Sequence, residues 1–224
     1  MPDYGPTDTA APQTVPPTDR AQDLRARAEG GDVAAGFCLG WCLASGQAGA
    51  RDEEQGLVWY RKAAERGHAL AQYRLGMLHT EGRLVAGDDQ LAVTLFQKAA
   101  DQGLPEAAYT LGVMYAGGRG VAQNQAQAVA WCRRAALQGH AEAQFTLGLM
   151  CAKGDGMPRD GWQAVSWCRK AAALGHPEAQ YTLAVMYARG DGVVQDAAQG
   201  VKWYRQAAEQ GHAKAQFGLG EAYA

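Results

Sequence analysis

The sequence has no excess of either charge, since 21 Lys and Arg residues stand against 23 Asp and Glu residues and the formal net charge is −2. Without a basic surplus, neither a nucleic acid nor an anionic membrane is indicated as the partner. Runs of 18 consecutive apolar residues are also missing, which argues against a membrane-spanning helix. The first residues lack the basic and apolar regions of a signal peptide, so the expected location is the cytosol.

Motifs for catalysis, cofactors and metals are missing too. No Ser-His-Asp or Cys-His pairing is evident, and the five cysteines do not have a zinc-like spacing. The glycine-rich segments 117–120, 154–156 and 190–192 follow no strand and precede no lysine of a phosphate-binding loop. We therefore expect a protein that is not an enzyme and that has no cofactor and no metal site.

What the sequence does have is a repeat with a period of 36 residues. Six glycines open the same phrase, Gly-His-Ala-Glu-Ala-Gln-Tyr-x-Leu-Gly or a variant of it: Gly31, Gly67, Gly103, Gly139, Gly175 and Gly211. A fixed period of this length is typical of a solenoid, in which each unit buries its apolar face only when a neighbour stacks on it. The predicted fold is therefore an all-α solenoid of helix-turn-helix repeats.

Each repeat is expected to hold two helices, which we call A and B. The A helices follow the repeated glycine and are predicted at 33–45, 69–80, 105–116, 141–152, 177–188 and 213–223. The B helices begin after an Asp or Asn that recurs every 36 residues and end at an Ala-Ala pair; these predicted caps are Asp52, Asp88, Asn124, Asp160 and Asp196. Four of the five caps have a glutamine three residues later, as in a capping box.

The two ends of the chain differ from the repeats. Residues 1–17 are rich in Pro and Thr and are expected to be a disordered tail. Residues 18–29 resemble an additional polar B helix that would cap the solenoid domain, which is expected to span 18–224 with five full repeats from about residue 31. The last A helix, 213–223, has no B helix after it, so either the chain is truncated at Ala224 or another copy or a partner covers that end.

Small residues recur inside the A helices. Glycine or alanine occupies one slot in every copy: Gly40, Gly76, Gly112, Gly148, Ala184 and Gly220. A glycine inside a helix costs about 1 kcal/mol relative to alanine, so a periodic one indicates close approach of a neighbour, for which the B-helix alanines are expected. Cys132 and Cys168 fill a B-helix slot held by aromatic residues elsewhere, and Cys151 fills a slot held by tyrosine, so these three are expected to be reduced core residues.

Three segments resemble a known family. They are Ala-Glu-Ala-Gln-Phe-Thr-Leu-Gly-Leu-Met at 141–150, Gly-Asp-Gly-Met/Val at 154–157 and 190–193, and Ala-Val-x-Trp-Cys-Arg-Lys/Arg-Ala-Ala at 128–136 and 164–172. These segments are similar to SEL-like repeats, of the suppressor/enhancer-of-lin type, which are related to tetratricopeptide repeats. The resemblance implies a right-handed superhelix and an adaptor that holds partner proteins. One cysteine-rich branch of the family is linked to β-lactam hydrolysis, but this chain lacks its regular cysteine pairs.

The resemblance also implies that the A helices line a concave, partner-binding groove. Counting Ala69, Pro105 and Ala141 as first residues, positions 2, 5 and 9 form one stripe at helical spacing. The residues expected to bind a partner are Trp41, Met77, Val113, Leu149 and Val185 at position 9, Tyr73, Tyr109 and Tyr181 at position 5, Glu106, Glu142 and Glu178 at position 2, and Arg74 beside them. Such a groove suits a peptide with apolar anchors and some basic residues. The open alternatives are that position 9 is inter-repeat core and that the position 5 aromatics serve packing first.

Other features have simpler interpretations. Basic residues recur on the B helices, and a solvated face is favoured over a nucleic-acid-binding stripe; the series is Arg61, Lys62, Lys98, Arg133, Arg134, Arg169, Lys170 and Arg205. His68, His140, His176 and His212 recur with the period and are expected to serve turns or helix caps, because ligands of one metal cannot lie a repeat apart. Two other functions stay open, a β-lactam-hydrolysing enzyme and a structural element that self-assembles through the C-terminal helix.

Overall fold

The computed structural model describes residues 17–47 and 49–223, and this part of the chain contains twelve helices and no strand. The helices are α1 (Pro17–Glu29), α2 (Val33–Ser45), α3 (Glu53–Glu65), α4 (Ala69–Glu81), α5 (Asp89–Asp101), α6 (Pro105–Gly117), α7 (Gln125–Leu137), α8 (Ala141–Lys153), α9 (Gly161–Ala173), α10 (Pro177–Arg189), α11 (Ala197–Glu209) and α12 (Ala213–Tyr223). The predicted all-α repeat architecture is confirmed, and each A helix agrees with its predicted range to within one residue. The tail expected at 1–17 lies outside the described residues, apart from Pro17, where α1 begins.

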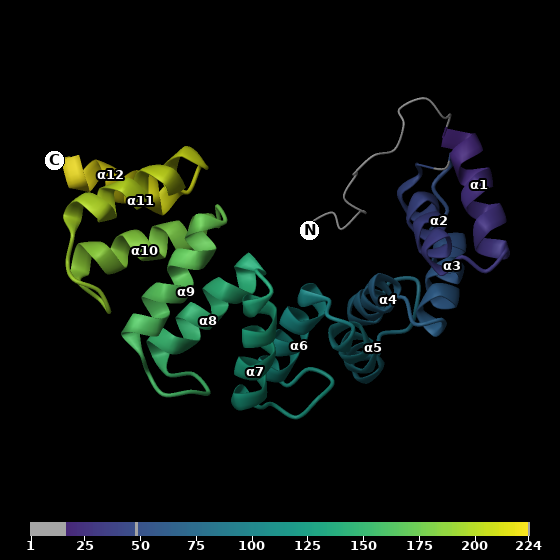
Figure 1. Ribbon diagram of the computed structural model, residues 1–224, viewed down its shortest axis with the longest axis horizontal. Helices are drawn as coiled ribbons and strands as arrows, with labels where there is room; N and C mark the ends of the chain where they lie inside the picture. Colours follow the sequence, from purple (N-terminus) through teal and green to yellow (C-terminus); the bar gives the residue numbers. More distant parts are fainter. Residues whose placement is uncertain (1–16, 48, 224) are drawn as a thin grey trace. The chain divides into compact units, whose positions relative to one another are not determined.

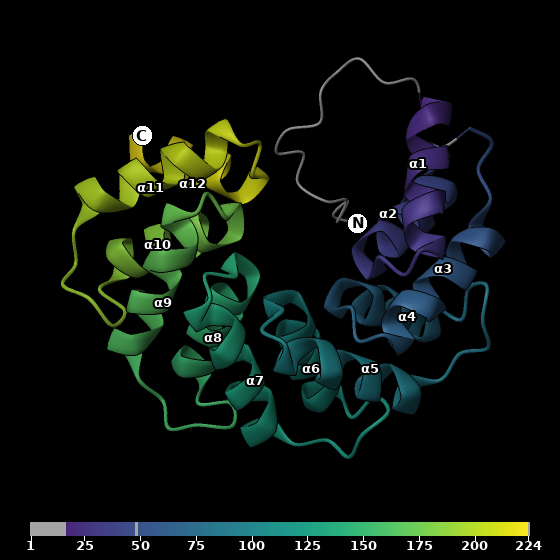
Figure 2. The same cartoon turned by 45° about the vertical axis from the view of Figure 1, so that its right-hand side comes forward.

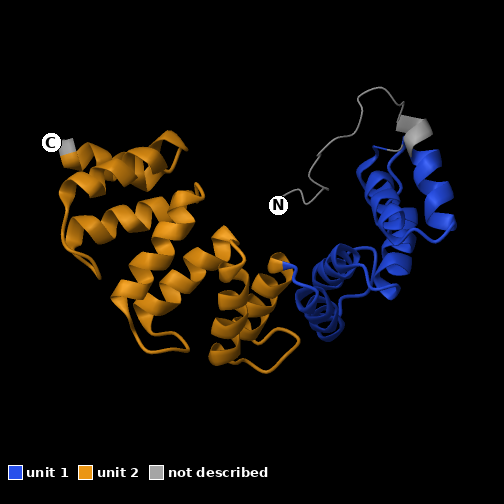
Figure 3. Ribbon diagram, in the orientation of Figure 1, with its two compact units in different colours: residues 1–104 blue, residues 105–224 orange. Residues whose placement is uncertain are grey.

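The repeats divide into two compact units, residues 1–104 and residues 105–224 (Figure 3). Unit 1 contains α1 to α5, and unit 2 contains α6 to α12. Within each unit every helix packs on the helix before it and the helix after it, as Figures 1 and 2 show from two directions. The even-numbered helices are the A helices and the odd-numbered helices are the B helices. In unit 1, α1 buries Leu24 and Ala28, which pack with α2 and α3 in one core cluster.

All five predicted B-helix caps accept a hydrogen bond from the backbone N–H three residues later. In a complete capping box, the side chain three residues later would accept a hydrogen bond from the backbone N–H of the cap residue. Here that N–H already donates to a carbonyl of the preceding A helix, so the second bond is not formed. The N–H of Asp160 donates to the carbonyl of Cys151 (2.8 Å), and that of Asn124 donates to the carbonyl of Tyr115 (2.9 Å). This main-chain bond fixes the turn between the A and B helices of a repeat.

The repeated glycine ends each B helix in a left-handed turn. Gly139 has φ 87° and Gly175 has φ 85°, a conformation that residues with a Cβ atom rarely adopt. The next residue closes the turn, since the N–H of His140 donates to the carbonyl of Ala135 (3.2 Å). This 6→1 bond is the mark of a Schellman motif, which satisfies carbonyls that the helix end would leave unpaired.

The periodic glycines of the A helices allow close contact with the following B helix. A Cβ atom on Gly112 would lie 2.6 Å from Sγ of Cys132, and one on Gly148 would lie 2.8 Å from Sγ of Cys168. In unit 1, a Cβ atom on Gly76 would lie 2.7 Å from the ring of Phe96. The predicted close approach is confirmed, but the nearest atoms belong to the aromatic-or-cysteine slot of the B helix rather than to its alanines.

The cysteines in the described part of the chain form no disulfide. Cys132, Cys151 and Cys168 have no solvent-exposed surface, as expected for small core residues. Burial raises the pKa of Cys132 to about 11 and that of Cys168 to about 12. Thiols with such pKa values are poor nucleophiles, because the reactive form is the thiolate.

Candidate protein-binding surface

The position 9 side chains of the A helices lie at the surface or partly beneath it. Val113 of unit 2 has 47% of its surface exposed, although its neighbours Leu111 and Met114 in the same helix are buried. The other members of the row are half-buried: Trp41 and Met77 in unit 1, and Leu149 and Val185 in unit 2. Each unit therefore presents part of an apolar row outside its fully buried core.

The position 5 aromatic rings serve packing. Tyr73 is buried in unit 1, where its ring lies 5.6 Å from that of Phe96. In unit 2, Tyr109 stacks on His140 with 5.0 Å between ring centroids, and Tyr181 stacks on His212 at 4.8 Å. The partner of each tyrosine is thus a side chain of the same protein, and only the half-buried rings of unit 2 also reach solvent.

Two of the three position 2 glutamates form pairs with histidines of the next repeat. Oε2 of Glu142 lies 2.7 Å from Nε2 of His176, and Oε1 of Glu178 lies 3.0 Å from Nε2 of His212. Both carboxylates stay exposed while the histidines are largely buried. Glu106 is half-buried near His140, and its charge raises the pKa of that histidine against the larger effect of burial, which lowers it.

The expected capping role of the repeated histidines is present in the structure. Nδ1 of His68, His140, His176 and His212 accepts a hydrogen bond from the backbone N–H of the third residue of the A helix, at 3.1–3.3 Å. An Nδ1 that accepts carries no proton, so the proton of the neutral ring is on Nε2. In His176 and His212 this is the atom that faces Glu142 and Glu178, respectively. One ring therefore caps its own helix and binds the repeat before it.

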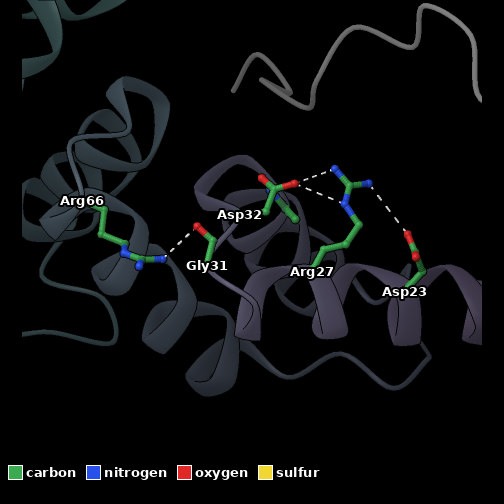
Figure 4. A network of polar contacts seen from close by, with 6 residues as sticks. Asp23, Arg27, Gly31, Asp32 and Arg66 are labelled. Atoms are coloured by element: carbon green, nitrogen blue, oxygen red, sulfur yellow. Dashed lines mark hydrogen bonds and ion pairs between the residues drawn. The ribbon is translucent and has the colours of Figure 1, made fainter.

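The first repeat uses a carboxylate where four of the five later ones use histidine and one has Leu104. Asp32 caps α2 by accepting from the N–H of Ala35 (3.0 Å), and the same side chain accepts from Nη2 of Arg27 (2.7 Å). Figure 4 shows this pair together with Asp23, which lies 3.8 Å from Arg27. The Ala35 N–H and Arg27 together lower the pKa of Asp32. Arg66, the C-cap residue of α3, donates to the carbonyl of Gly31 (3.0 Å) and ties the next B helix to this turn.

Sequence reasoning missed a set of buried glutamines at position 4 of the A helices. Gln72, Gln144 and Gln180 are buried, and each donates from Nε2 to a backbone carbonyl at the end of the preceding B helix. The sequence feature that could have predicted them is a glutamine that recurs at the same position on an otherwise apolar face of the A helices. These amides explain how the carbonyls of Ala64, Ala136 and Ala172 are satisfied where the helices cross.

The basic series on the B helices lies on the surface. All of its residues are exposed except Arg134, which is half-buried. Several lie over the tryptophan one turn earlier in the same helix, with Lys62 4.5 Å from the ring of Trp59 and Lys170 4.1 Å from the ring of Trp167. Such cation–π contacts hold the basic side chains against their own helix.

Within the described part of the chain, no group of three His, Cys, Asp or Glu side chains could hold a metal ion. Within the same residues, no helix has both the length and the apolar character needed to cross a membrane.

Solved structures with the same fold are known. The chain is similar to a protective antigen present in uropathogenic Escherichia coli strains, with 38% identity, a TM-score of 0.88, and coverage of 91% of this chain and 44% of that one. This chain thus spans less than half of the antigen's length. It is also similar to a Sel1 repeat protein from Oxalobacter formigenes (29% identity, TM-score 0.78, 92% and 88% covered) and to an immunity protein from Pseudomonas aeruginosa (26% identity, TM-score 0.51, 84% and 68% covered). Among curated proteins no match was found.

The family model of the Sel1 repeat matches five consecutive segments, 38–68, 69–104, 105–140, 141–176 and 177–212. These segments follow the 36-residue period of the sequence and cover most of the chain. Proteins with Sel1 repeats typically bind other proteins and are generally scaffolds rather than enzymes. By these matches and by its fold, the chain belongs to the Sel1 repeat family.

Proposed function

We propose that this chain is a non-enzymatic adaptor that binds a partner protein or peptide along the A-helix stripe. The apolar anchors are the position 9 residues, the tyrosines of position 5 form the floor, and the glutamates of position 2 form the rim. The residues of this proposed site are Trp41, Met77, Val113, Leu149, Val185, Tyr73, Tyr109, Tyr181, Arg74, Glu106, Glu142 and Glu178. The partner would be an extended or helical segment with apolar side chains and some basic ones.

The observation that carries the proposal is that an apolar row stays partly exposed beside a buried core. Val113 is 47% exposed although Leu111, two residues before it, has no exposed surface. When a partner covers an exposed apolar side chain, binding is favoured by about 25 cal/mol for each Å² of apolar surface that is removed from water. Because position 9 varies between Trp, Met, Val and Leu while the neighbouring slots repeat, its side chains can be matched to one partner without disturbing the stack.

The glutamates add a charge preference. The carboxylates of Glu142 and Glu178 are exposed, and their histidine partners hold them in place. A carboxylate that is already ordered loses little side-chain entropy when it meets a lysine or arginine of the partner. This arrangement favours partner segments that carry basic residues beside their apolar anchors.

A pull-down with matched variants tests the proposal. The double substitution Val113→Glu and Leu149→Glu places two charges in the row and should abolish capture of the natural partner while the helical circular dichroism signal is kept. The matched control is Val194→Glu, because Val194 is 77% exposed and lies in the turn before α11, outside the stripe. Capture by the double variant, or equal loss in the control, would refute the binding site.

The two other functions give different outcomes with the same protein. Turnover of a chromogenic β-lactam above background would indicate an enzyme, and a mass that grows with concentration in light scattering would indicate self-assembly. Residence in the cytosol is part of our proposal, and cell fractionation with an antibody against the chain tests it.

A further inference from the structure

Two residues of the repeat 69–104 depart from the repeat pattern in the same place. Arg74 stands where the next three repeats have Thr110, Thr146 and Thr182, and Leu84 stands where they have Gly120, Gly156 and Gly192. Both side chains line one cavity of unit 1, which has a volume of about 100 Å³. Its other lining residues are Ala44, Glu53, Tyr60, Met77, Leu78, Glu81 and Arg83.

Leu84 has an unfavourable backbone conformation. Its φ is 64°, and it is the one described residue other than glycine with a positive φ. The equivalent Gly120 and Gly192 have φ values of 66° and 70°, so the turn keeps its shape although the glycine is lost. A side chain kept against this strain is a reason to look for a function, and Leu84 directs an apolar side chain, 41% exposed, to the cavity.

Tyr60 contributes a buried polar group to the same cavity. The residue is 3% exposed, and its hydroxyl proton has no acceptor among the described residues; Arg74, which interacts with the hydroxyl, is itself only a donor. Of the four equivalent residues, Phe96, Cys132 and Cys168 carry no hydroxyl, and Tyr204 does. Burial raises the pKa of Tyr60 more than the nearby Arg74 lowers it, so the group is a neutral O–H donor at neutral pH. A buried donor without an acceptor is costly.

The carboxylates around the cavity do not form ion pairs with Arg74. Glu53 is held by Arg51 and by Arg83, whose Nη2 lies 2.8 Å from Oε2 of the carboxylate. Glu81 is exposed. Among the described residues, no carboxylate pairs with Arg74, which is half-buried. The wall thus combines one cationic donor, one hydroxyl donor and the apolar side chains of Met77 and Leu84.

We propose that this cavity binds the carboxylate of an Asp or Glu side chain of a partner polypeptide. Arg74 turns toward the incoming carboxylate and uncovers the Tyr60 hydroxyl, and both groups donate to the carboxylate oxygens. Arginine and a buried hydroxyl are strong donors to a carboxylate, and Met77 and Leu84 pack against the methylene groups next to it. Glu81 disfavours a second acidic residue beside the first, so the motif is a single acid flanked by apolar residues.

This inference rests on the proposed adaptor function, since it specifies one contact that the partner makes with the stripe at Arg74 and Met77. It differs from the basic preference of the glutamate rim in unit 2, because Arg74 lies in unit 1. A partner that satisfies both would carry an acidic residue in one segment and basic residues in another.

The test uses three synthetic peptides and the full chain. The probe is Ac-Leu-Glu-Leu-NH₂, with Ac-Leu-Gln-Leu-NH₂ as the neutral control and Ac-Leu-Gln-Leu-OH as a source of a terminal carboxylate. Binding is followed through the Nε–H NMR signal of Arg74, assigned by its absence in Arg74→Thr, and through the backbone amides of α4. The Glu peptide should bind at least tenfold more tightly than the Gln peptide. Equal binding of the two, no binding of the Glu peptide, or tighter binding of the terminal carboxylate would overturn the proposal.

Three variants separate binding from folding. Arg74→Thr introduces the residue of the next three repeats and should weaken binding of the Glu peptide at least tenfold. Tyr60→Phe should weaken binding of the same peptide about fivefold. Leu84→Gly restores the turn residue, so binding should weaken while the melting temperature does not fall; unchanged binding in all three variants would contradict the site. The Val194→Glu variant, which alters neither the stripe nor the cavity, should bind the Glu peptide normally. Capture of the natural partner without binding of the Glu peptide would refute this cavity alone, whereas binding of the Glu peptide without capture would refute the adaptor row alone.

Discussion

Nε2 of His176 lies 2.7 Å from Oε2 of Glu142, which is 34 residues earlier in the chain. Nδ1 of the same ring accepts the N–H of Ala179 at 3.1 Å, and the ring packs on Phe145 with 4.9 Å between centroids. One side chain therefore caps a helix, pairs with a carboxylate and covers an aromatic ring of the preceding repeat. Such a residue joins neighbouring repeats, on which the stability of a solenoid depends.

The first prediction concerns pH and the histidine caps. Burial lowers the pKa of His68 and His140, so the folded protein binds their protons less tightly than the unfolded chain does. Their contribution to stability is complete above the ordinary histidine pKa of about 6.5 and is lost as pH falls through the lower pKa of the folded state. We expect the urea midpoint to fall between pH 7 and pH 5, as measured by circular dichroism.

A cap that does not titrate should reduce this dependence. In His140→Asn the asparagine side chain can still accept the N–H of the A helix, but it takes up no proton. The urea midpoint of this variant should change less with pH than that of the wild type. A midpoint that falls as steeply in His140→Asn would show that His140 is not a source of the effect.

The second prediction concerns the buried glutamines. Oε1 of Gln180 accepts from Nε2 of Gln210 (2.7 Å), and Oε1 of Gln72 accepts from Nε2 of Gln102 (2.8 Å). At the equivalent place in the repeat between them, Leu174 stands in the donor's position, and the buried Oε1 of Gln144 has no partner among the described residues. Leu174 is 57% exposed, so Leu174→Gln adds a donor without opening the core.

We expect Leu174→Gln to raise the free energy of unfolding by about 1 kcal/mol, the net value of one hydrogen bond. The reciprocal control is Gln210→Leu, which leaves Gln180 without its donor and should cost about 1 to 3 kcal/mol. Chemical denaturation measures both changes. If both substitutions raise or both lower the free energy of unfolding, the hydrogen bonds between the glutamine pairs are not the cause of the changes.

The third prediction concerns the periodic glycines. Gly112→Ala places a Cβ atom against Sγ of Cys132 and against the carbonyl oxygen of Ala128 (3.2 Å), and such overpacking costs about 1 to 3 kcal/mol. Gly220 occupies the same slot in α12 and has no atom within 4 Å of an added Cβ. Gly220→Ala should therefore stabilise the protein, by up to about 1 kcal/mol, because alanine favours the helix. Thermal melts that show equal effects for both substitutions would exclude close packing as the reason for the glycines.

The fourth prediction concerns the thiols. With pKa values of about 11 and about 12, Cys132 and Cys168 are almost entirely protonated at pH 8, and both are fully buried. Iodoacetamide should leave them unmodified in the native protein and label them in urea, as mass spectrometry of tryptic peptides would show. Rapid labelling of either residue under native conditions would indicate that its helix pair opens.

Local sequence signals predicted the helices well, because each signal acts within a few residues. Asp160 marks a helix start by accepting an N–H three residues away, and Gly175 ends a helix because it tolerates a left-handed turn. The period then repeats these signals, so the ranges of the A helices came out to within one residue. The roles of the repeated histidines as caps and of Cys132 as core followed from the same register.

The contacts that one helix makes with another could not be predicted in this way. His176 at the start of α10 pairs with Glu142 of α8, and Gln210 at the end of α11 donates to Gln180 of α10. Arg74 of α4 and Leu84 of the turn after it line one cavity together with Tyr60 of α3. Whether two such residues meet depends on how far each helix is shifted and rotated against the next, and packing of many side chains sets those values at once.

By itself, the sequence determined that this protein is built of repeated helix pairs, where each helix begins and ends, and which slots must be small, because backbone hydrogen bonds and turn conformations are local requirements. Only the tertiary structure decided which polar groups are satisfied inside the fold, which apolar side chains stay exposed, and where a donor such as the Tyr60 hydroxyl is left without an acceptor. The reason is that burial and pairing are properties of packed surfaces, which form only when one repeat lies against the next.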